Sequence, residues 1–177
     1  MRIISGDCKG RKIIFPKNLP VRPTTDIAKE SIFNILSNKY DFNNISILDL
    51  FTGSGNISYE FYSRGSKDVL AVDNNLKCVN FVKKESKRLG MNISVIKTDV
   101  FKFFKNKVKV DVIFADPPYS IDTKKLNLII KLVFNNQVLN ENGTFILEHY
   151  KKIDFSEHKN FKETRTYGDS SFSFFEQ

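Results

Sequence analysis

The sequence predicts an α/β fold in which helices pack on a mixed, mostly parallel sheet that ends in an antiparallel hairpin. Three observations support this prediction. Short apolar runs of strand length alternate with helical segments from residue 25 to residue 149. Two further short runs, 161–167 and 171–175, flank the turn Gly168-Asp169. The 177 residues suffice for a sheet covered on both faces, so we expect a single domain spanning residues 1–177.

The first 23 residues are expected to form a small basic β-hairpin arm followed by a stiff connector. Apolar runs at 2–4 and 12–15 flank a turn-forming cluster at 6–10, and three prolines follow. We expect this arm to lie outside the sheet core, with its cations in contact with phosphates: Arg2, Lys9, Arg11, Lys12, Lys17 and Arg22. The alternative is a solvated edge hairpin whose lysines prevent aggregation.

Capping and periodicity define the core elements in residues 24–177. Thr25 is expected to cap a helix that has Asp26 in its first turn and runs to about Asn38. Asn142-Gly143 is expected to form a turn. The expected strands are 45–51, 68–73, 93–97, 110–115 and 144–149; the other expected helices are 56–64, 76–89 and 123–135, with a short helix after Asp99.

The first strand leads into a glycine-rich turn that opens a helix, as in the first unit of a nucleotide-binding fold. Gly53 and Gly55 permit a tight turn and a close approach of the backbone to a ligand. Ser58 replaces the third glycine of the pyrophosphate-binding pattern, and Asp49 would repel a pyrophosphate. A carboxylate at this position instead suits a ligand that carries a positively charged amine.

Acidic residues also follow the next two strands. Asp73 lies 20 residues beyond Gly53, which is the spacing of an acid that binds ribose hydroxyls. The alternative role of Asp73 is to cap the helix that follows. Asp99 comes after the third strand, where its carboxylate would be placed to accept a hydrogen bond from an adenine amino group.

The apolar run 110–115 ends abruptly in Asp116-Pro117-Pro118-Tyr119. Two prolines cannot continue a strand, so we expect Asp116 and Tyr119 at its carboxyl end, where α/β sheets bind ligands. A carboxylate, a fixed backbone carbonyl and an aromatic ring together suit a planar base with an exocyclic amino group, once the base has left its helix. The alternative is a polar turn capped by Asp116, with Tyr119 packed on the surface.

The composition narrows the class of partner. A net charge of +8 favours nucleic acid, although an A+T-rich genome would also enrich lysine. No apolar run is as long as a membrane span, and we expect no secretory signal. Cys8 and Cys78 are expected as reduced thiols, and neither they nor His149 and His158 have metal-binding spacing. We therefore expect a cytoplasmic protein without a metal.

These motifs all follow successive strands, so a parallel sheet would gather them at one rim. In these motifs the sequence resembles class I S-adenosylmethionine-dependent methyltransferases, which have a Rossmann-like fold. More narrowly, it resembles the RsmD family of bacterial 16S ribosomal RNA guanine-N2 methyltransferases. That resemblance covers nearly the whole chain, is most specific at 22–26, and rests on residues 2–6, 10–12, 22–26, 30, 33–34, 49–55, 63–65, 115–119 and 167–169.

The resemblance implies a role for each motif. The catalytic turn would be Asp116, Pro117, Pro118 and Tyr119: the Asp116 carboxylate and the Pro117 carbonyl would hold the guanine amino group, and Tyr119 would stack on the base. S-adenosyl-L-methionine would be bound by Asp49, Phe51, Gly53, Gly55, Asp73, Asn74, Asp99 and Val100. In that set Asp73 would bind the ribose, and Asp99 with Val100 the adenine. A monomer would bind 16S rRNA of the 30S subunit through Arg11, Lys12 and Arg22.

The sequence leaves other functions open. An adenine-N6 DNA methyltransferase shares the order of the motifs, although 177 residues leave no room for a separate target-recognition domain. A dinucleotide-dependent oxidoreductase is disfavoured by the missing third glycine and by the Asp-Pro-Pro-Tyr turn. An RNA-binding module with a decayed pocket is disfavoured because the motifs at the rim are intact.

Overall fold

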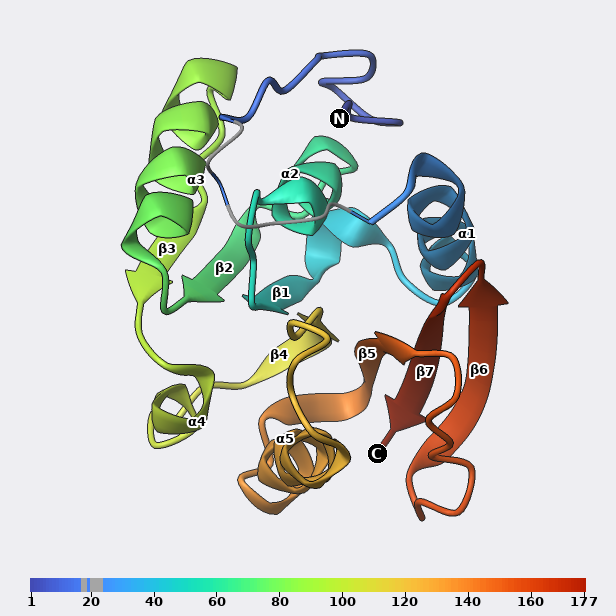
Figure 1. The fold of residues 1–177 in the computed structure, drawn as a ribbon. Coiled ribbons are helices and arrows are strands. Elements are labelled where there is room, and N and C mark those ends of the chain that lie inside the picture. Colours follow the sequence, from blue (N-terminus) through green and yellow to red (C-terminus); the bar gives the residue numbers. More distant parts are fainter. Residues whose placement is uncertain (17–18, 20–23) are drawn as a thin grey trace.

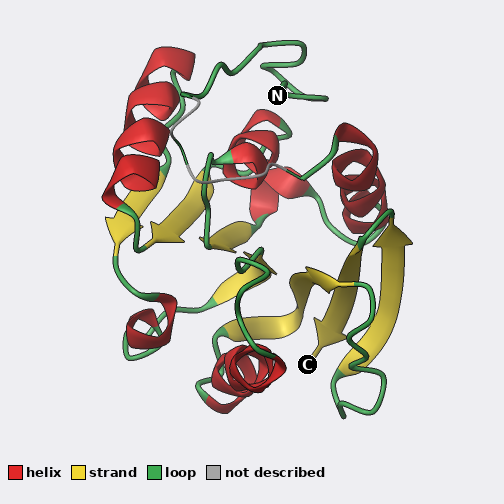
Figure 2. Ribbon diagram, viewed as in Figure 1, coloured by secondary structure: helices red, strands yellow, loops and turns green. Residues whose placement is uncertain are grey.

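The computed structural model describes residues 1–16, 19 and 24–177 (Figures 1 and 2). Its strands are β1 (Ser46–Leu50), β2 (Asp68–Asp73), β3 (Ser94–Lys97), β4 (Val110–Ala115), β5 (Leu139–Tyr150), β6 (Phe161–Tyr167) and β7 (Ser170–Glu176). Its helices are α1 (Asp26–Ser37), α2 (Asn56–Ser63), α3 (Leu76–Leu89), α4 (Val100–Phe103) and α5 (Thr123–Asn135), with a 3-10 turn at Phe42–Asn44. In this described part of the chain, seven strands form one sheet in the order β3-β2-β1-β4-β5-β7-β6.

Parallel pairing joins the first five strands. β1 lies between β2 and β4, while β3 extends the sheet beyond β2 and β5 extends it beyond β4. β7 then pairs antiparallel with both β5 and β6, which forms the expected C-terminal hairpin. The prediction of a mixed, mostly parallel sheet is therefore confirmed, and the carboxyl ends of β1, β2, β4 and β5 share one rim.

The turn expected at Asn142-Gly143 is wrong, because both residues lie inside β5. The register against β4 shifts there: Val110 pairs with Leu139, whereas Val112 pairs with Thr144. Asn142 has a φ of 61°, a left-handed conformation that Asn adopts more readily than most residues. The Asn-Gly pair thus forms an irregularity within a long strand, where the sequence pattern indicated a boundary.

Helices cover both faces of the sheet, as Figure 1 shows. α1, α2 and α3 pack on the face that contains the buried side chains of Ile47, Phe114 and Ile146. α4 and α5 pack on the opposite face, which contains the alternate residues of the same strands: Leu48, Ile113 and Leu147. Among the described residues, no helix is long and apolar enough to cross a membrane.

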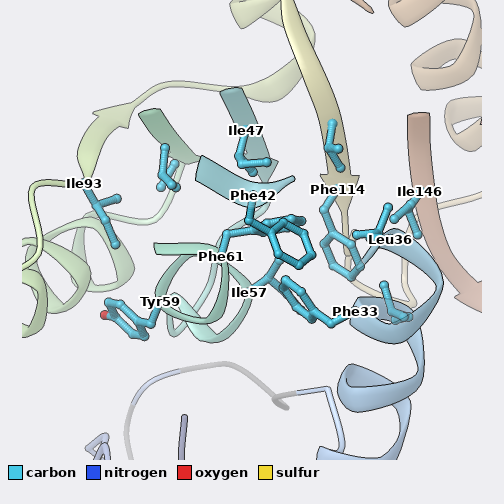
Figure 3. Packing of buried hydrophobic residues seen from close by; sticks show 14 of the residues in the cluster. Phe33, Leu36, Phe42, Ile47, Ile57, Tyr59, Phe61, Ile93, Phe114 and Ile146 are labelled. Carbon is cyan, nitrogen blue, oxygen red and sulfur yellow. The ribbon is translucent and has the colours of Figure 1, made fainter. Parts of the chain in front are cut away.

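Aromatic rings fill the layer beneath α1 and α2 (Figure 3). Phe33 of α1 meets Phe61 of α2 in an edge-to-face arrangement, with ring centroids 4.5 Å apart. Phe42 lies 5.8 Å from Phe33 and 5.9 Å from Phe61. Such pairs stabilise a core by about 0.5–1.5 kcal/mol beyond their buried area. This packing fixes α1 and α2 against each other, and both helices begin beside the cavity described below.

The N-terminal arm is packed into the core, which corrects the expectation that it lies outside it. Ile3 and Ile13 are buried and belong to the same apolar layer as α1 and α2. Among the described residues of the arm, strand pairing consists of one isolated bridge between Arg2 and Lys12, so the expected hairpin has no extended ladder there. Ile3 and Ile13 thus anchor the arm to the core, whereas Ile14 and the cations Arg11 and Lys12 are exposed.

Gly6 allows the arm to touch α2 closely. Its φ is 80°, and a Cβ atom at this position would lie 1.8 Å from the carbonyl oxygen of Ser63. The N–H of Asp7 donates to that same oxygen at 2.8 Å. Only glycine permits this approach, so the turn of the arm is anchored to the end of α2.

Candidate active site at the carboxyl ends of the strands

A cavity of about 970 Å³ opens above the carboxyl ends of β1, β2, β4 and β5. The starts of α1 and α2 and the turn between β6 and β7 complete its walls. Four carboxylates from the rim of the sheet line it, each near the carboxyl end of a different strand: Asp49, Asp73, Asp116 and Glu148. Asp169, in the turn between β6 and β7, adds a fifth. The volume is within the range of small-molecule and cofactor sites.

The four carboxylates share one face of the sheet because of strand alternation. Asp49 pairs with Phe114 in the register of β1 and β4, and Phe114 belongs to the α1–α3 face. Ala115 pairs with Leu147. The next residue along each chain is Asp116, just after β4, and Glu148 of β5. Because side chains alternate along a strand, both of these lie on the α1–α3 face. A protein with a net charge of +8 therefore has an acidic cavity, which suits a cation or an amino group and disfavours a phosphate.

The glycine turn connects β1 to α2 along one wall of the cavity. Phe51 has a φ of 60°, a conformation that is rare for a bulky residue and that clusters at functional sites. The N–H of Gly53 donates to Asp73 Oδ2 at 2.9 Å, which ties the turn to the end of β2. Gly55, with a φ of 79°, is the N-cap of α2 and makes no side-chain capping bond. This turn is shaped by its backbone, as the sequence predicted.

Asp49 is buried at the centre of this wall. Its Oδ2 accepts hydrogen bonds from the hydroxyl groups of Thr52 and Ser58. Burial raises the pKa of Asp49 from 3.8 to about 6, although the two hydroxyl groups lower it and Asp73 adds to the rise. Holding this carboxylate ionised is costly, and a bound cation would offset that cost.

The Asp116–Tyr119 turn leaves β4 where the sequence predicted. The N–H of Asp116 donates to the carbonyl oxygen of Leu50 at 3.3 Å, which holds the turn against β1. Burial raises the pKa of Asp116 well above 3.8, and the carboxylates of Glu148 and Asp49 raise it further. Tyr119 is 51% exposed, and its hydroxyl group hydrogen-bonds to Ser170, the first residue of β7. An acceptor and an aromatic ring thus flank the mouth of the cavity.

The other predicted cofactor residues divide into two groups. Asn74 lines the cavity together with Phe51, Gly53 and the two aspartates of β1 and β2. Gly55, Asp99 and Val100 are not among the described residues that line it. Asp99 instead accepts a hydrogen bond from the N–H of Lys102 and caps α4, and Val100 is buried. Adenine binding by Asp99 and Val100 stays a prediction.

Sequence reasoning gave no role to several residues that line the cavity, among them Glu148, Thr24 and Tyr167. Glu148 lies in the strand 144–149 but was given no role, although an acid at the end of an apolar run is an unusual residue for a buried strand. Thr24 Oγ1 donates to Glu148 Oε2 at 3.1 Å, across 124 residues of sequence. Tyr167, at the end of β6, lines the cavity and hydrogen-bonds to Ser31 of α1. No local pattern identifies Thr24 or Tyr167, because only the fold brings them to the cavity.

The predicted phosphate-binding residues lie on the arm. Arg11 and Lys12 are exposed, and Arg88 at the end of α3 donates to the Lys12 carbonyl oxygen at 3.2 Å. The arm therefore runs beside α3 (Figure 1). Arg11, Lys12 and Arg88 are all exposed cations. Arg22, the third predicted residue, lies outside the described residues.

The two cysteines and His149 have surroundings that the structure describes. Cys8 and Cys78 are free thiols. The ring nitrogens of His149 lie 2.8 Å from Ser173 Oγ and 3.0 Å from the Tyr150 carbonyl oxygen, so this ring is a bonded part of the core. Within residues 1–16, 19 and 24–177, no three His, Cys, Asp or Glu side chains are grouped as a metal would require.

With this geometry in view, comparison with known proteins identifies the family. The family model described as Conserved hypothetical protein 95 matches residues 1–176. Ribosomal RNA small subunit methyltransferase D of Buchnera aphidicola subsp. Acyrthosiphon pisum is 38% identical over 155 residues, which cover 85% of this chain and 78% of that protein. The chain belongs to the RsmD family. The family member from Haemophilus influenzae is 31% identical over 157 residues, covering 85% of this chain and 79% of its own.

Solved structures have the same fold. A hypothetical protein of Thermus thermophilus superposes with a TM-score of 0.87 over 100% of this chain and 99% of its own, at 24% identity. A 16S rRNA N2 G1207 methyltransferase of the same organism, solved in complex with AdoMet and guanosine, superposes with a TM-score of 0.67 at 18% identity. That match covers 87% of this chain and 44% of the other. The Rossmann-like methyltransferase fold implied by the sequence is therefore confirmed.

Proposed function

We propose that this chain uses S-adenosyl-L-methionine to methylate the exocyclic N2 amino group of a guanine in 16S ribosomal RNA. The proposal rests mainly on the Asp116–Tyr119 turn, which brings a carboxylate, a proline-fixed carbonyl and an exposed aromatic ring to the mouth of one acidic cavity. Two observations add to it. The family members named above are ribosomal RNA small subunit methyltransferases, and a protein of the same fold binds AdoMet and guanosine.

The acidic lining and the volume of the cavity suit the cofactor. When bound, S-adenosyl-L-methionine supplies a methyl group from a positively charged sulfonium centre. Asp49 would face the positively charged methionine end, supported by the backbone of Gly53 and Gly55. Asp73 would accept hydrogen bonds from the ribose hydroxyls, because its carboxylate is fixed by the N–H groups of Gly53 and Asn75 at 2.9 and 2.8 Å.

The protein's own contribution to the reaction would be positioning. The Asp116 carboxylate and the Pro117 carbonyl would each accept one hydrogen of the N2 amino group, which turns the nitrogen lone pair out of the plane of the base. The Tyr119 ring would stack on the flipped base. Methylation releases one proton from the nitrogen, and the raised pKa of Asp116 suits its carboxylate oxygen to accept that proton.

The substrate would bind outside the cavity through its phosphates. The acidic cavity disfavours phosphate, whereas the exposed cations Arg11 and Lys12 of the arm attract it. We place Arg22 in the same role from its sequence alone. The chain would act as one domain and as a monomer on the small subunit, in the cytoplasm.

Transfer of a labelled methyl group tests the proposal. Labelled S-adenosyl-L-methionine is incubated in parallel with unmodified 30S particles, naked 16S rRNA and DNA, and the product nucleoside is identified by mass spectrometry. We expect N2-methylguanosine from ribosomal RNA and none with Asp116→Ala. Formation of N6-methyladenine in DNA would instead show that the protein is a DNA methyltransferase. Cofactor binding without transfer to any of the three would refute the proposed substrate.

A further inference from the structure

Glu148 adds a second carboxylate to the part of the cavity that contains the Asp116–Tyr119 turn. It ends the apolar stretch of β5 and is 5% exposed. It follows Leu147, the register partner of Ala115, just as Asp116 follows Ala115. Neighbouring strands lie about 4.8 Å apart, so the two side chains leave the sheet side by side. After burial itself, the Glu148 carboxylate is the largest cause of the raised pKa of Asp116.

Both acids line the cavity, so a ligand in it can contact the two carboxylates together. Desolvation and mutual repulsion oppose the ionisation of adjacent buried acids, so a ligand that brings adjacent hydrogen-bond donors is favoured at this point. Glu148 also makes contacts within the protein, among them the bond from Thr24.

The edge of guanine supplies those donors in adjacent positions. Guanine carries the ring N1–H beside its N2 amino group, so its edge presents donors side by side. Adenine instead has a lone pair at N1, which a carboxylate repels. Enzymes that flip a base read it through hydrogen bonds to this same edge. An amino-binding carboxylate alone accepts both bases, but a second carboxylate next to it distinguishes them.

We propose that Glu148 is the residue that selects guanine, with its carboxylate accepting the ring N1–H of the target base while Asp116 holds the N2 amino group. This inference rests on the proposed function and names the specificity determinant of that site. A carboxylate accepts up to about four hydrogen bonds, so the bond from Thr24 is compatible with a further donor from the base.

Thr24 orients Glu148 through a chain of buried contacts. The Thr24 carbonyl oxygen accepts from Asn56 Nδ2 at 3.1 Å, and Asn56 Oδ1 accepts from Lys29 Nζ at 2.8 Å. Lys29 and Asn56 belong to α1 and α2, which the aromatic layer fixes in place. The position of the Glu148 carboxylate is thereby tied to the two helices that frame the cavity.

A substitution of the base isolates the predicted contact. The ribosomal RNA substrate identified by the labelling experiment is prepared with guanosine or with 2-aminopurine riboside at the mapped position. 2-Aminopurine keeps the amino group at C2 but has a lone pair at N1. Initial rates are measured for the wild type, for Glu148→Gln and for the control Glu141→Gln, which changes an exposed acid of the same strand.

The wild type should prefer guanosine over 2-aminopurine by about tenfold or more, because its carboxylate meets a donor in one base and a lone pair in the other. Glu148→Gln presents an amide that can donate to N1, so this preference should fall at least about tenfold. Glu141→Gln should keep the preference, and all three proteins should bind S-adenosyl-L-methionine equally.

Each other outcome has a definite meaning. An unchanged preference in Glu148→Gln, or equal losses on both bases, would overturn the inference and leave Glu148 a structural residue. Weakened cofactor binding in Glu148→Gln would assign it to the cofactor and would also overturn the inference. Failure of the wild type to methylate guanosine would instead refute the proposed function, so the two failures are distinguishable.

Discussion

The ammonium group of Lys29 lies 3.2 Å from Glu60 Oε2, and both side chains are fully buried. The same carboxylate accepts hydrogen bonds from the backbone N–H groups of Ile4 and Ser5, at 2.9 and 3.0 Å, and from Arg64 Nε at 2.8 Å. One buried acid therefore joins the N-terminal arm to α1 and α2. The arm that we propose for RNA binding and the helices that frame the cavity form one connected unit.

Glu60→Gln should lower the free energy of unfolding by about 3–5 kcal/mol, because it leaves the Lys29 ammonium buried without its counter-ion. Urea unfolding measures this loss. Glu157→Gln, which neutralises an exposed acid, is the control and should change the unfolding free energy by less than about 0.5 kcal/mol. Equal stability of the two variants would mean that the buried pair contributes nothing net.

Asp116→Ala should lower the rate of methyl transfer at least about 100-fold, because the amino group of the base loses the acceptor that orients it. Affinity for S-adenosyl-L-methionine should stay within a few-fold of the wild type, as measured by calorimetry. A joint loss of transfer and of cofactor binding would show that Asp116 is a structural residue.

Asp73→Ala should weaken cofactor binding by about tenfold or more, because the variant loses the ribose acceptor and releases the N–H groups that hold the glycine turn. Calorimetric titration of S-adenosyl-L-methionine measures the effect. Asp68→Ala is a matched control, since Asp68 is an exposed acid at the other end of the same strand. If both variants bind equally well, Asp73 serves only as a cap.

Asp49 should make stability depend on pH. Its pKa is raised from 3.8 in the unfolded chain to about 6 in the fold, so the native state binds more protons between these values. The contribution of this carboxyl group to stability is full below about pH 4 and is lost as the pH rises through about 6. The loss amounts to about 3 kcal/mol at pH 7.

Asp49→Asn removes this titration, so its stability relative to the wild type should rise between pH 4 and pH 7 by up to about 3 kcal/mol. Urea unfolding at several pH values measures the difference. The substitution also alters the bonds from Thr52 and Ser58, but that effect is independent of pH and cancels in the trend. A difference that stays flat with pH would contradict the raised pKa.

Arg11→Ala with Lys12→Ala should weaken RNA binding and flatten its salt dependence. Each phosphate contact on single-stranded nucleic acid contributes about 0.7 to the slope of log K against log salt, so the slope should fall by about 1.4. Filter binding over a range of KCl concentrations measures it. The control pair Lys105→Ala with Lys107→Ala removes two exposed cations next to α4. If both double variants show the same salt-dependence slope, the arm does not contact the RNA.

The sequence by itself determined most of the elements and three of the carboxylates of the cavity. Apolar runs of strand length placed β4 at 110–115, and the prolines after it ended the strand at the residue where the structure ends it. The carboxyl ends of parallel strands meet at one rim. The sequence alone therefore predicts that Asp49, Asp73 and Asp116 lie close together. Local conformational rules sufficed because each of these residues lies at or near the carboxyl end of its own strand.

Only the tertiary structure decided which residues join them from a distance. The place of Glu148 beside Asp116 depends on the register of β5 against β4, which shifts near Asn142 where the sequence indicated a turn. The burial of Ile3 and Ile13 and the Lys29–Glu60 pair likewise join segments that are far apart along the chain. Such contacts depend on packing and on pairing between strands, and these are properties of the assembled sheet and its helices rather than of any local run of residues.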